Sequence, residues 1–290
     1  MAILPDAHLH AAALAALAAA LFGTALVTTH SALHYLDATA GARVSIPTAA
    51  VLFWMLSPFH DLAGWGAAAI GLFALVGLFF PAAVTLLTFE SNRRYGPNVT
   101  GTIGCTAPLF AVLGAAVFLA EPLGSRTLIA TGLIVLGSIA LASPRVAGGR
   151  WGGASWLPWS AAALRALAQV LSKAGLALWA SPFAAALVGY TVSSAAVWAT
   201  ALGGRRHTRP FNRRGVAWFA LTGALNGAAV LSLYHALSRG PVTLVSPIAA
   251  TYPLFTLLLS AVVLRQQRLS APLIGGVALT VTGVAVLLAP

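Results

Sequence analysis

The sequence predicts an all-α integral membrane protein of ten transmembrane helices, arranged as two inverted five-helix repeats. Hydrophobic residues make up 59% of the 290 residues and charged residues only 7%, against roughly 25% charged residues in globular proteins. Several apolar runs reach the ~20 residues that a helix needs to cross a bilayer, without the alternation of a membrane β-barrel. The third observation is a long stretch of sequence that occurs twice.

The duplicated stretch covers residues 95–144 and 239–290. Each copy opens with Gly-Pro, carries Pro-Leu-Phe inside an apolar run, breaks at a short polar turn and closes with a glycine-containing apolar run. Pro108-Leu109-Phe110 matches Pro253-Leu254-Phe255 at an offset of 145 residues. An internal repeat indicates the overall architecture, so it is interpreted before any local pattern. We therefore expect two repeats, over residues 1–144 and 145–290.

Ten apolar segments are expected to span the membrane, five in each half. Because five is odd, the second half must enter the membrane from the side opposite to the first. Such inverted-topology repeats are typical of secondary transporters. The expected spans are residues 11–29, 42–57, 66–89, 97–119, 126–143, 157–179, 182–202, 215–237, 241–264 and 271–289.

The net charge of +11 is interpreted as a topology signal rather than as a nucleic-acid-binding surface. Loops with odd numbers, counted from the N-terminus and including the adjacent helix ends, carry twelve arginines, whereas the even loops carry only Arg126 and Arg239. The positive-inside rule places the odd loops in the cytoplasm, so both termini are expected outside. The arginine- and alanine-rich composition suggests a bacterial, inner-membrane protein. A single cysteine, Cys105, leaves no internal disulfide and no thiolate metal cluster.

The repeated stretch resembles the EamA-type transporters of the drug/metabolite transporter superfamily. The residues that carry the likeness are the two Gly-Pro pairs, the Pro-Leu-Phe triplets, the Phe118-Leu119-Ala120-Glu121 turn and the glycines of the fifth and tenth spans. The resemblance implies a secondary carrier without enzyme activity or cofactor, often an exporter of amino acids or related compounds. Two departures stand out. The repeat partner of Glu121 is Gln266, and many members place the N-terminus inside.

Pro108 and Pro253 are the first candidates for a substrate site. Each lies about 17 Å past the proline that opens its helix, near the middle of a ~30 Å hydrocarbon core. A proline within a helix frees a carbonyl and kinks the helix, and matching interrupted segments in two halves point to a transporter's binding site. A kink that only serves packing is the alternative. Four flanking residues could bind substrate, namely Thr106, Ser246, Thr251 and Tyr252. Serine and threonine in membrane helices also bond backbone groups or neighbouring helices, which is the alternative role.

Arg165, Gln169 and Lys173 lie four residues apart on the sixth span. A charge inside a membrane helix costs about 2.5–3.5 kcal/mol even on the mildest scale and usually marks a cavity or a paired partner. We expect a cationic wall that holds a carboxylate or phosphate of the substrate. The alternative is an arginine and a lysine that reach opposite membrane interfaces.

Glu90 and His235 are the candidates for coupling transport to a proton. Glu90 is the acidic residue placed to face a cavity from a helix end, although a helical ion pair with Arg93 and Arg94 explains it as well. Histidine titrates near neutral pH, and Asn226 adds a further polar group to the same span as His235. A structural hydrogen bond is the alternative role for this histidine.

A secondary transporter of small polar metabolites, such as amino acids, is the function that the sequence favours. An integral-membrane enzyme that modifies lipids would need a compact catalytic set, and the chain has only five acidic residues. A non-transporting membrane scaffold is the remaining alternative. The expected partners are a small-molecule substrate and the lipid bilayer, with the chain acting as a monomer or homodimer.

Overall fold

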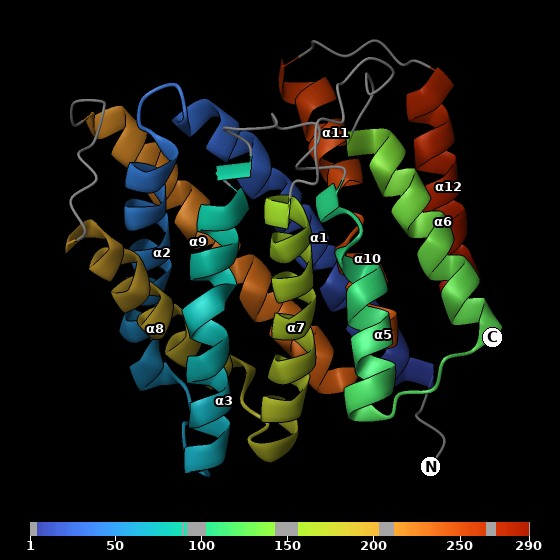
Figure 1. Cartoon of the computed structure of the whole chain (residues 1–290), viewed down its shortest axis with the longest axis horizontal. Coiled ribbons are helices and arrows are strands. Elements are labelled where there is room, and N and C mark those ends of the chain that lie inside the picture. The colour runs from blue at the N-terminus through green and yellow to red at the C-terminus, as the bar shows by residue number, and fades with distance from the viewer. Residues whose placement is uncertain are drawn as a thin grey trace.

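The computed structural model describes residues 5–88, 90–91, 103–142, 156–202, 212–264 and 271–289, and within these ranges every regular element is a helix. The elements of the first half are α1 (Pro5–Ala32), α2 (Ala38–Leu56), the short η1 (Ser57–Phe59), α3 (Ala67–Gly77), η2 (Leu78–Ala83), α5 (Ala107–Leu119) and α6 (Ser125–Ala142). Those of the second half are α7 (Trp156–Leu178), α8 (Pro182–Leu202), α9 (Arg213–Arg239), α10 (Val242–Ala249), α11 (Tyr252–Leu264) and α12 (Ala271–Leu288). Figure 1 shows them as a bundle of roughly upright helices.

Nine helical segments of the described chain are long and apolar enough to cross a bilayer, and α5 is a shorter apolar helix. They fall on the ten stretches that hydropathy predicts. Three of the stretches are not continuous helices. Residues 78–83 form a π-helical turn inside the third span, and the fourth and ninth spans are each interrupted by a non-helical turn, at Cys105-Thr106 and at Ala250-Thr251.

The helices pack in pairs that recur when the two halves are exchanged. If α1, α2, α3, α5 and α6 are matched in order to α7, α8, α9, α10/α11 and α12, the α1–α9 contact corresponds to α7–α3. Likewise α2–α9 corresponds to α8–α3, and α5–α7 corresponds to α11–α1. The α2–α8 and α6–α12 contacts each join a helix to its own counterpart. The two halves are therefore interleaved around a shared centre.

The helix ends sort into two sides of the bundle. On one side Gly240 lies against Ala11, the Trp179 indole donates to the Ala63 carbonyl, and Arg126 donates to the Val286 carbonyl near the end of α12. This side therefore holds the even loops together with the start of α1 and the end of α12, and it is the lower side in Figure 1. On the other side Gly215 lies against Tyr35 and Leu36, which joins the first and seventh loops.

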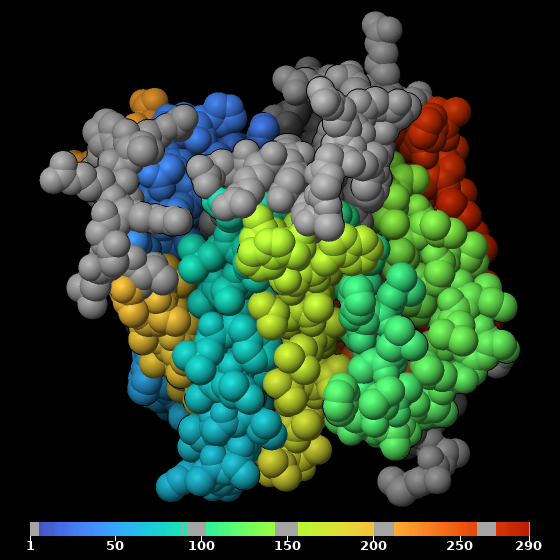
Figure 2. Space-filling view, viewed as in Figure 1, coloured from blue at the N-terminus to red at the C-terminus, as the bar shows by residue number. Residues whose placement is uncertain are grey.

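The outer surface of the bundle is apolar. Val117, Phe118 and Leu136 are 75%, 73% and 58% exposed, and a contiguous apolar exterior of this kind needs a lipid environment. Figure 2 shows α3 and α7 side by side on one such face. Trp156 and Trp159 are 62% and 45% exposed at the start of α7, and exposed tryptophans at helix ends are typical of a membrane interface.

Glycines let α6 and α12 approach closely. A Cβ on Gly137 would lie 2.6 Å from the Thr280 amide nitrogen, and one on Gly283 would lie 2.9 Å from the Ala130 carbonyl oxygen. Small residues allow such backbone contact between membrane helices. The glycine pattern alone marks Gly132 and Gly275 for the same role, but both face open space. Within α6 and α12, the closely packed glycines are those on the contact line between the two helices.

Candidate functional site

A cavity of about 700 Å³ lies at the centre of the bundle. Its walls come from both halves, and it reaches the ends of helices that border the odd loops, at His30, Thr88, Ala142 and Pro158. Most of the wall is apolar, as is usual for small-molecule sites. The polar side chains that line it are Thr29, His30, Ser45, Thr85, Thr88, Arg165, Gln169, Tyr190, Thr222, Asn226, Ser246, Tyr252 and Thr256.

The two helix breaks beside this cavity have the same local geometry. The Thr106 hydroxyl donates to the Ile103 carbonyl at 2.6 Å, and the Thr251 hydroxyl donates to the Ile248 carbonyl at 2.8 Å. The amides of the same two threonines donate to the same carbonyls at 3.0 Å. Threonine side chains that bond a nearby backbone carbonyl offer an alternative to helical pairing. Each threonine therefore ends one helical segment just before the next begins.

Pro108 and Pro253 then stand in the first turn of α5 and α11, and both line the cavity. Proline suits the start of a helix because it has no N–H to donate. The carbonyls left without a proline N–H belong to the residues four positions earlier, Gly104 and Ala249, which also line the cavity. The expectation of a kinked continuous helix is thus replaced by a discontinuous one.

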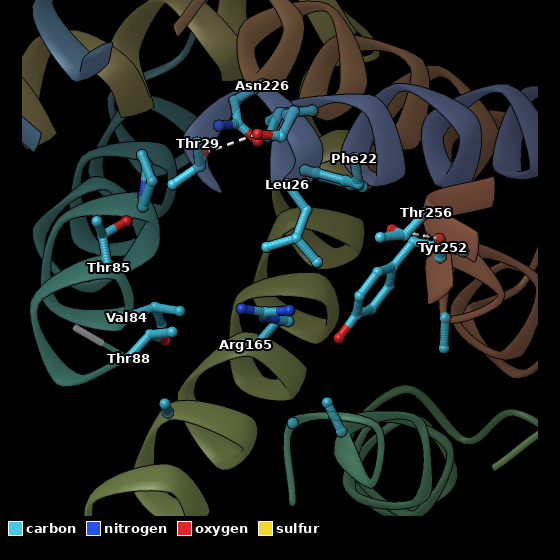
Figure 3. A pocket seen from close by; sticks show the side chains of 18 of the residues that line it. Phe22, Leu26, Thr29, Val84, Thr85, Thr88, Arg165, Asn226, Tyr252 and Thr256 are labelled. Atoms are coloured by element: carbon cyan, nitrogen blue, oxygen red, sulfur yellow. Dashed lines mark hydrogen bonds between the residues drawn. The ribbon is translucent and has the colours of Figure 1, made fainter. Parts of the chain in front are cut away.

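Arg165 is the cationic side chain of the cavity wall. It lies on α7, about 14 Å from the start of that helix, and is half-buried. Figure 3 shows its guanidinium and the Tyr252 phenol of α11 pointing toward the same space, with Leu26 of α1 beside them. The Tyr252 hydroxyl also lies 3.9 Å from the Cys105 sulfur. Arg165 and Tyr252 both come from the second half, and Cys105 of the first half contacts Tyr252 at this point.

Several polar atoms of cavity-lining residues are buried without a hydrogen-bond partner in the described chain. They are Arg165 Nε, Gln169 Oε1, Tyr190 Oη and Ser246 Oγ, and all four residues line the cavity. Buried polar groups are normally hydrogen-bonded, so each exception calls for an explanation. A polar ligand within the cavity would supply these partners.

The third span supplies the opposite wall. Its helix is interrupted at the cis peptide bond between Phe80 and Pro81, where Phe80 has an extended backbone. Ser193 of α8 donates to the Gly77 carbonyl at 2.5 Å, which satisfies one backbone group before the interruption. Thr85 and Thr88 follow one and two turns later and line the cavity (Figure 3).

Lys173 has a different position from the one expected. Its ammonium donates to the Leu237 and Gly240 carbonyls at 2.6 and 2.9 Å, at the C-terminal end of α9. Across the same junction the Glu121 carboxylate accepts from the Val242 and Thr243 amides at 2.8 and 2.9 Å, at the start of α10. A cation at a helix C-terminus and an anion at an N-terminus are both favourable. We call Lys173 and Glu121 the charge clamp.

The charge clamp lies below the cavity, on the even-loop side. Ala11, Leu237, Val242 and Val245 are fully buried around it. Lys173 is not among the cavity-lining residues. Arg165 and Lys173 are eight residues apart, which places them about 12 Å apart along the helix and about 80° apart around it. Arg165 therefore belongs to the cavity wall, whereas Lys173 binds the C-terminal end of α9.

The structure brings together Pro108, Pro253, Tyr252, Arg165, Gln169 and Asn226 from the residues that the sequence singles out. Thr106 and Thr251 stand behind the wall, where they form the helix breaks. His235 lies in the last turn of α9, 3.1 Å from the exposed Arg239 and away from the central cavity. Glu90 is half-buried and does not line the cavity either, and Arg93 and Arg94, its suggested partners, lie outside the described residues.

Sequence reasoning missed the polar residues contributed by α1, by the third span and by α8. Thr29, Thr85, Thr88 and Tyr190 lie on predominantly apolar helices and belong to no motif of the repeated stretch. Pro81 was the available signal for two of them, because a proline within an apolar span marks an interruption as Pro108 and Pro253 do.

None of the five acidic residues of the chain lines the cavity. All five lie in the described residues, so this holds for the whole sequence. Asp37 accepts from the Ala40 amide at the start of α2, Asp61 is exposed and accepts from the Ala63 amide, and Glu121 belongs to the charge clamp. Asp6 lies in the first turn of α1 and Glu90 in the third span.

Comparison with known proteins identifies the family. The model of the EamA-like transporter family matches twice, over residues 9–143 and 153–289. No curated protein sequence matches the chain significantly. Among solved structures 29 chains match, and one, described as a crystal structure of a protein, superposes with a TM-score of 0.78 over 95% of each chain at 20% identity, which shows a shared fold. Since the family model covers nearly all of both halves, this chain belongs to the EamA-like transporter family.

Proposed function

We propose that the protein is a secondary transporter that exports small polar metabolites, such as amino acids, by alternating access. The observation that carries this proposal is the central cavity, which is built at two matching helix breaks and contains Arg165. Discontinuous helices place the positive N-terminal ends of half-helices and unpaired carbonyls at a binding site within the membrane. The cavity volume of about 700 Å³ is ample for an amino acid.

The proposed architecture is ten spans in two inverted repeats, residues 1–144 and 145–290. The helix contacts that recur on exchange of the halves support it. So does the location of the start of α1 and the end of α12 on one side of the bundle (Figure 1). Rocking of one half against the other around a fixed central site is the motion that such repeats allow.

The proposed direction of transport follows from where the cavity reaches. It extends to the helix ends that border the odd loops, while the charge clamp and its buried apolar neighbours lie at the opposite end. The arginine bias assigns the odd loops to the cytoplasm. In this state the site is loaded from the cytoplasm, as an exporter in a bacterial inner membrane requires.

We also propose that Glu90 or His235 couples transport to a proton. Both side chains lie away from the cavity wall, so a proton held on either would have to act through the helices rather than on the substrate. A monomer is sufficient for the proposed mechanism, because one chain encloses the cavity with helices of both halves.

Counterflow in liposomes tests the proposal. Purified full-length protein is reconstituted, loaded with one unlabelled amino acid at a time, and assayed for uptake of the same labelled amino acid. We expect saturable counterflow for at least one amino acid, and at least a tenfold reduction in Arg165→Gln. Arg214→Gln, which removes an exposed arginine at the start of α9, is the matched control and should retain the flux. No saturable counterflow across a panel of amino acids and nucleosides would contradict transport.

A further inference from the structure

We infer that the carboxylate is the obligatory group of the transported substrate and that its amino group is dispensable. The preferred substrate class is then a small organic anion with an apolar body, such as a 2-hydroxy acid, rather than an amine. This inference rests on the proposed function because it names the substrate class of the same cavity.

The cavity wall contains a guanidinium but no carboxylate. Arg165 is half-buried in the wall, and all five acidic residues of the chain are accounted for elsewhere. A cation inside a membrane protein normally faces a paired anion or a water-filled cavity. Here no carboxylate of the lining balances the guanidinium, so an anionic ligand is the missing partner.

The helix breaks strengthen the same preference. α5 begins at Ala107 and α11 at Tyr252, and both residues line the cavity. The N-terminal end of a helix carries a partial positive charge and unpaired N–H groups, which suit an anion. Arg165 and two helix N-termini together make this part of the cavity electropositive.

An ammonium group finds only neutral acceptors in the same place. Examples are Gln169 Oε1, which is buried and has no partner in the described chain, and the carbonyls of Gly104 and Ala249. Hydrogen bonds of this kind can hold an amino group, but they do not offset its charge within a low-dielectric cavity. A zwitterion therefore gains little from its amino group, and a free amine meets repulsion from Arg165.

The remaining side chains of the cavity wall are mostly apolar, and they determine which substituent of the ligand fits beside its carboxylate. Phe22, Leu26 and Phe80 line the cavity together with Val84, Val230 and Leu257. These side chains favour an aliphatic or aromatic substituent over a second charged group. A monocarboxylate fits this lining better than a dicarboxylate, whose second charge would be buried without a partner.

Three ligands with one skeleton and different head groups test the inference. L-3-phenyllactate is an anion, L-phenylalanine a zwitterion and phenethylamine a cation. Binding of each to full-length protein in lipid nanodiscs is measured by calorimetry at pH 7. We expect phenyllactate to bind at least as tightly as phenylalanine, and phenethylamine to bind at least 100-fold more weakly than phenyllactate.

Variants of Arg165 test whether the preference for an anionic ligand depends on this side chain. Arg165→Gln should weaken phenyllactate binding on the order of 10- to 100-fold, which is the usual effect of losing charge-assisted hydrogen bonds. Arg165→Lys keeps the charge and should recover part of this loss, while Arg239→Gln should bind phenyllactate as the unmodified protein does. Thermal unfolding of each variant in the same nanodiscs shows whether it is folded.

The outcomes separate this inference from the proposed function. Binding of phenethylamine comparable to that of phenyllactate, phenyllactate binding that Arg165→Gln leaves unchanged, or no phenyllactate binding would each overturn the inference. Arg165-dependent phenyllactate binding without counterflow in liposomes would support the binding site and reject transport. Amino acid counterflow that Arg165→Gln does not affect would support transport and reject the anion site.

Discussion

At the scale of single residues, position rather than residue type decides what a side chain does. Thr106 and Thr251 flank the cavity in the sequence, yet their hydroxyl groups are used by the backbone at the two helix breaks. Tyr252 follows the second threonine and faces the cavity, where the matching residue of the first half is Ala107. The two threonines therefore shape the backbone in the same way in both halves. The residue after each threonine differs, because Tyr252 brings a phenol to the cavity and Ala107 brings only a methyl group.

Two glycines of α6 give a prediction at this scale. Gly137→Ala places a methyl group against the Thr280 amide nitrogen and the Gly276 carbonyl, and should destabilise the protein by about 1–3 kcal/mol, the usual cost of overpacking. Gly132→Ala lies on the same helix with no atom near its Cβ, and should be neutral or stabilising by up to about 1 kcal/mol from helix propensity. Thermal unfolding in detergent, followed by tryptophan fluorescence, compares the two. Equal effects would contradict the close α6–α12 contact.

At the scale of helices, the charge clamp is the main difference between the two halves. Lys173 and Glu121 bind the ends of α9 and α10 on either side of Gly240-Pro241. Their repeat partners are Thr29 and Gln266. Thr29 donates to the Ala25 carbonyl within its own helix, and Gln266 lies outside the described residues. The sequence thus offers a charged pair at one junction and neutral residues at the equivalent positions of the other.

Neutralising the charge clamp should make closure of the even-loop side less stable. In a Cys105→Ser background, Ser246→Cys places a reporter thiol near the deep end of the cavity. Glu121→Gln, which installs the residue found in the other half, should raise its labelling rate from the even-loop side on the order of fivefold. A change of that size corresponds to the loss of about 1 kcal/mol, the typical contribution of a helix cap. Lys173→Met should act in the same direction. Arg214→Gln, at the opposite end of α9, serves as the control, and unchanged rates in both clamp variants would show that these contacts do not hold the gate.

Much of this element-level organisation could be predicted from the sequence. Hydropathy located the spans, and the duplicated Pro-Leu-Phe located the two breaks to within a turn. The partners of Lys173 could not be predicted, because they are backbone carbonyls of a helix about sixty residues away and carry no sequence signal. The same is true of Tyr190 and the third-span threonines, which have no counterpart in the repeat pattern. Contacts between helices that are distant in the sequence, and not local helix propensity, determine which side chains line the cavity.

At the scale of the whole molecule, the two sides of the bundle differ in the residues that they present. The even loops carry only two arginines, Arg126 and Arg239, whereas the odd loops and their helix ends carry twelve. Arg213 and Arg214 are examples among the described residues, and both are exposed at the start of α9. This distribution favours a single orientation in the membrane.

Cysteine labelling in intact cells tests the orientation. In a Cys105→Ser background, Asp61→Cys should react with an impermeant maleimide added outside, because Asp61 is exposed in an even loop. His34→Cys, exposed in the first loop, should react only after permeabilisation. The reverse pattern would place the N-terminus in the cytoplasm and would turn the described state of the cavity toward the outside.

A cavity with Arg165 in its wall and no carboxylate also bears on how transport is powered. An anion that leaves the cell moves with the inside-negative membrane voltage, which supplies about 2.3 kcal/mol per elementary charge at 100 mV. That energy sustains a concentration ratio of roughly fiftyfold without any co-transported ion. A transporter whose cavity has no carboxylate would then export organic anions driven by the membrane voltage. Each transport cycle would move a net charge, which can be measured directly as an electric current.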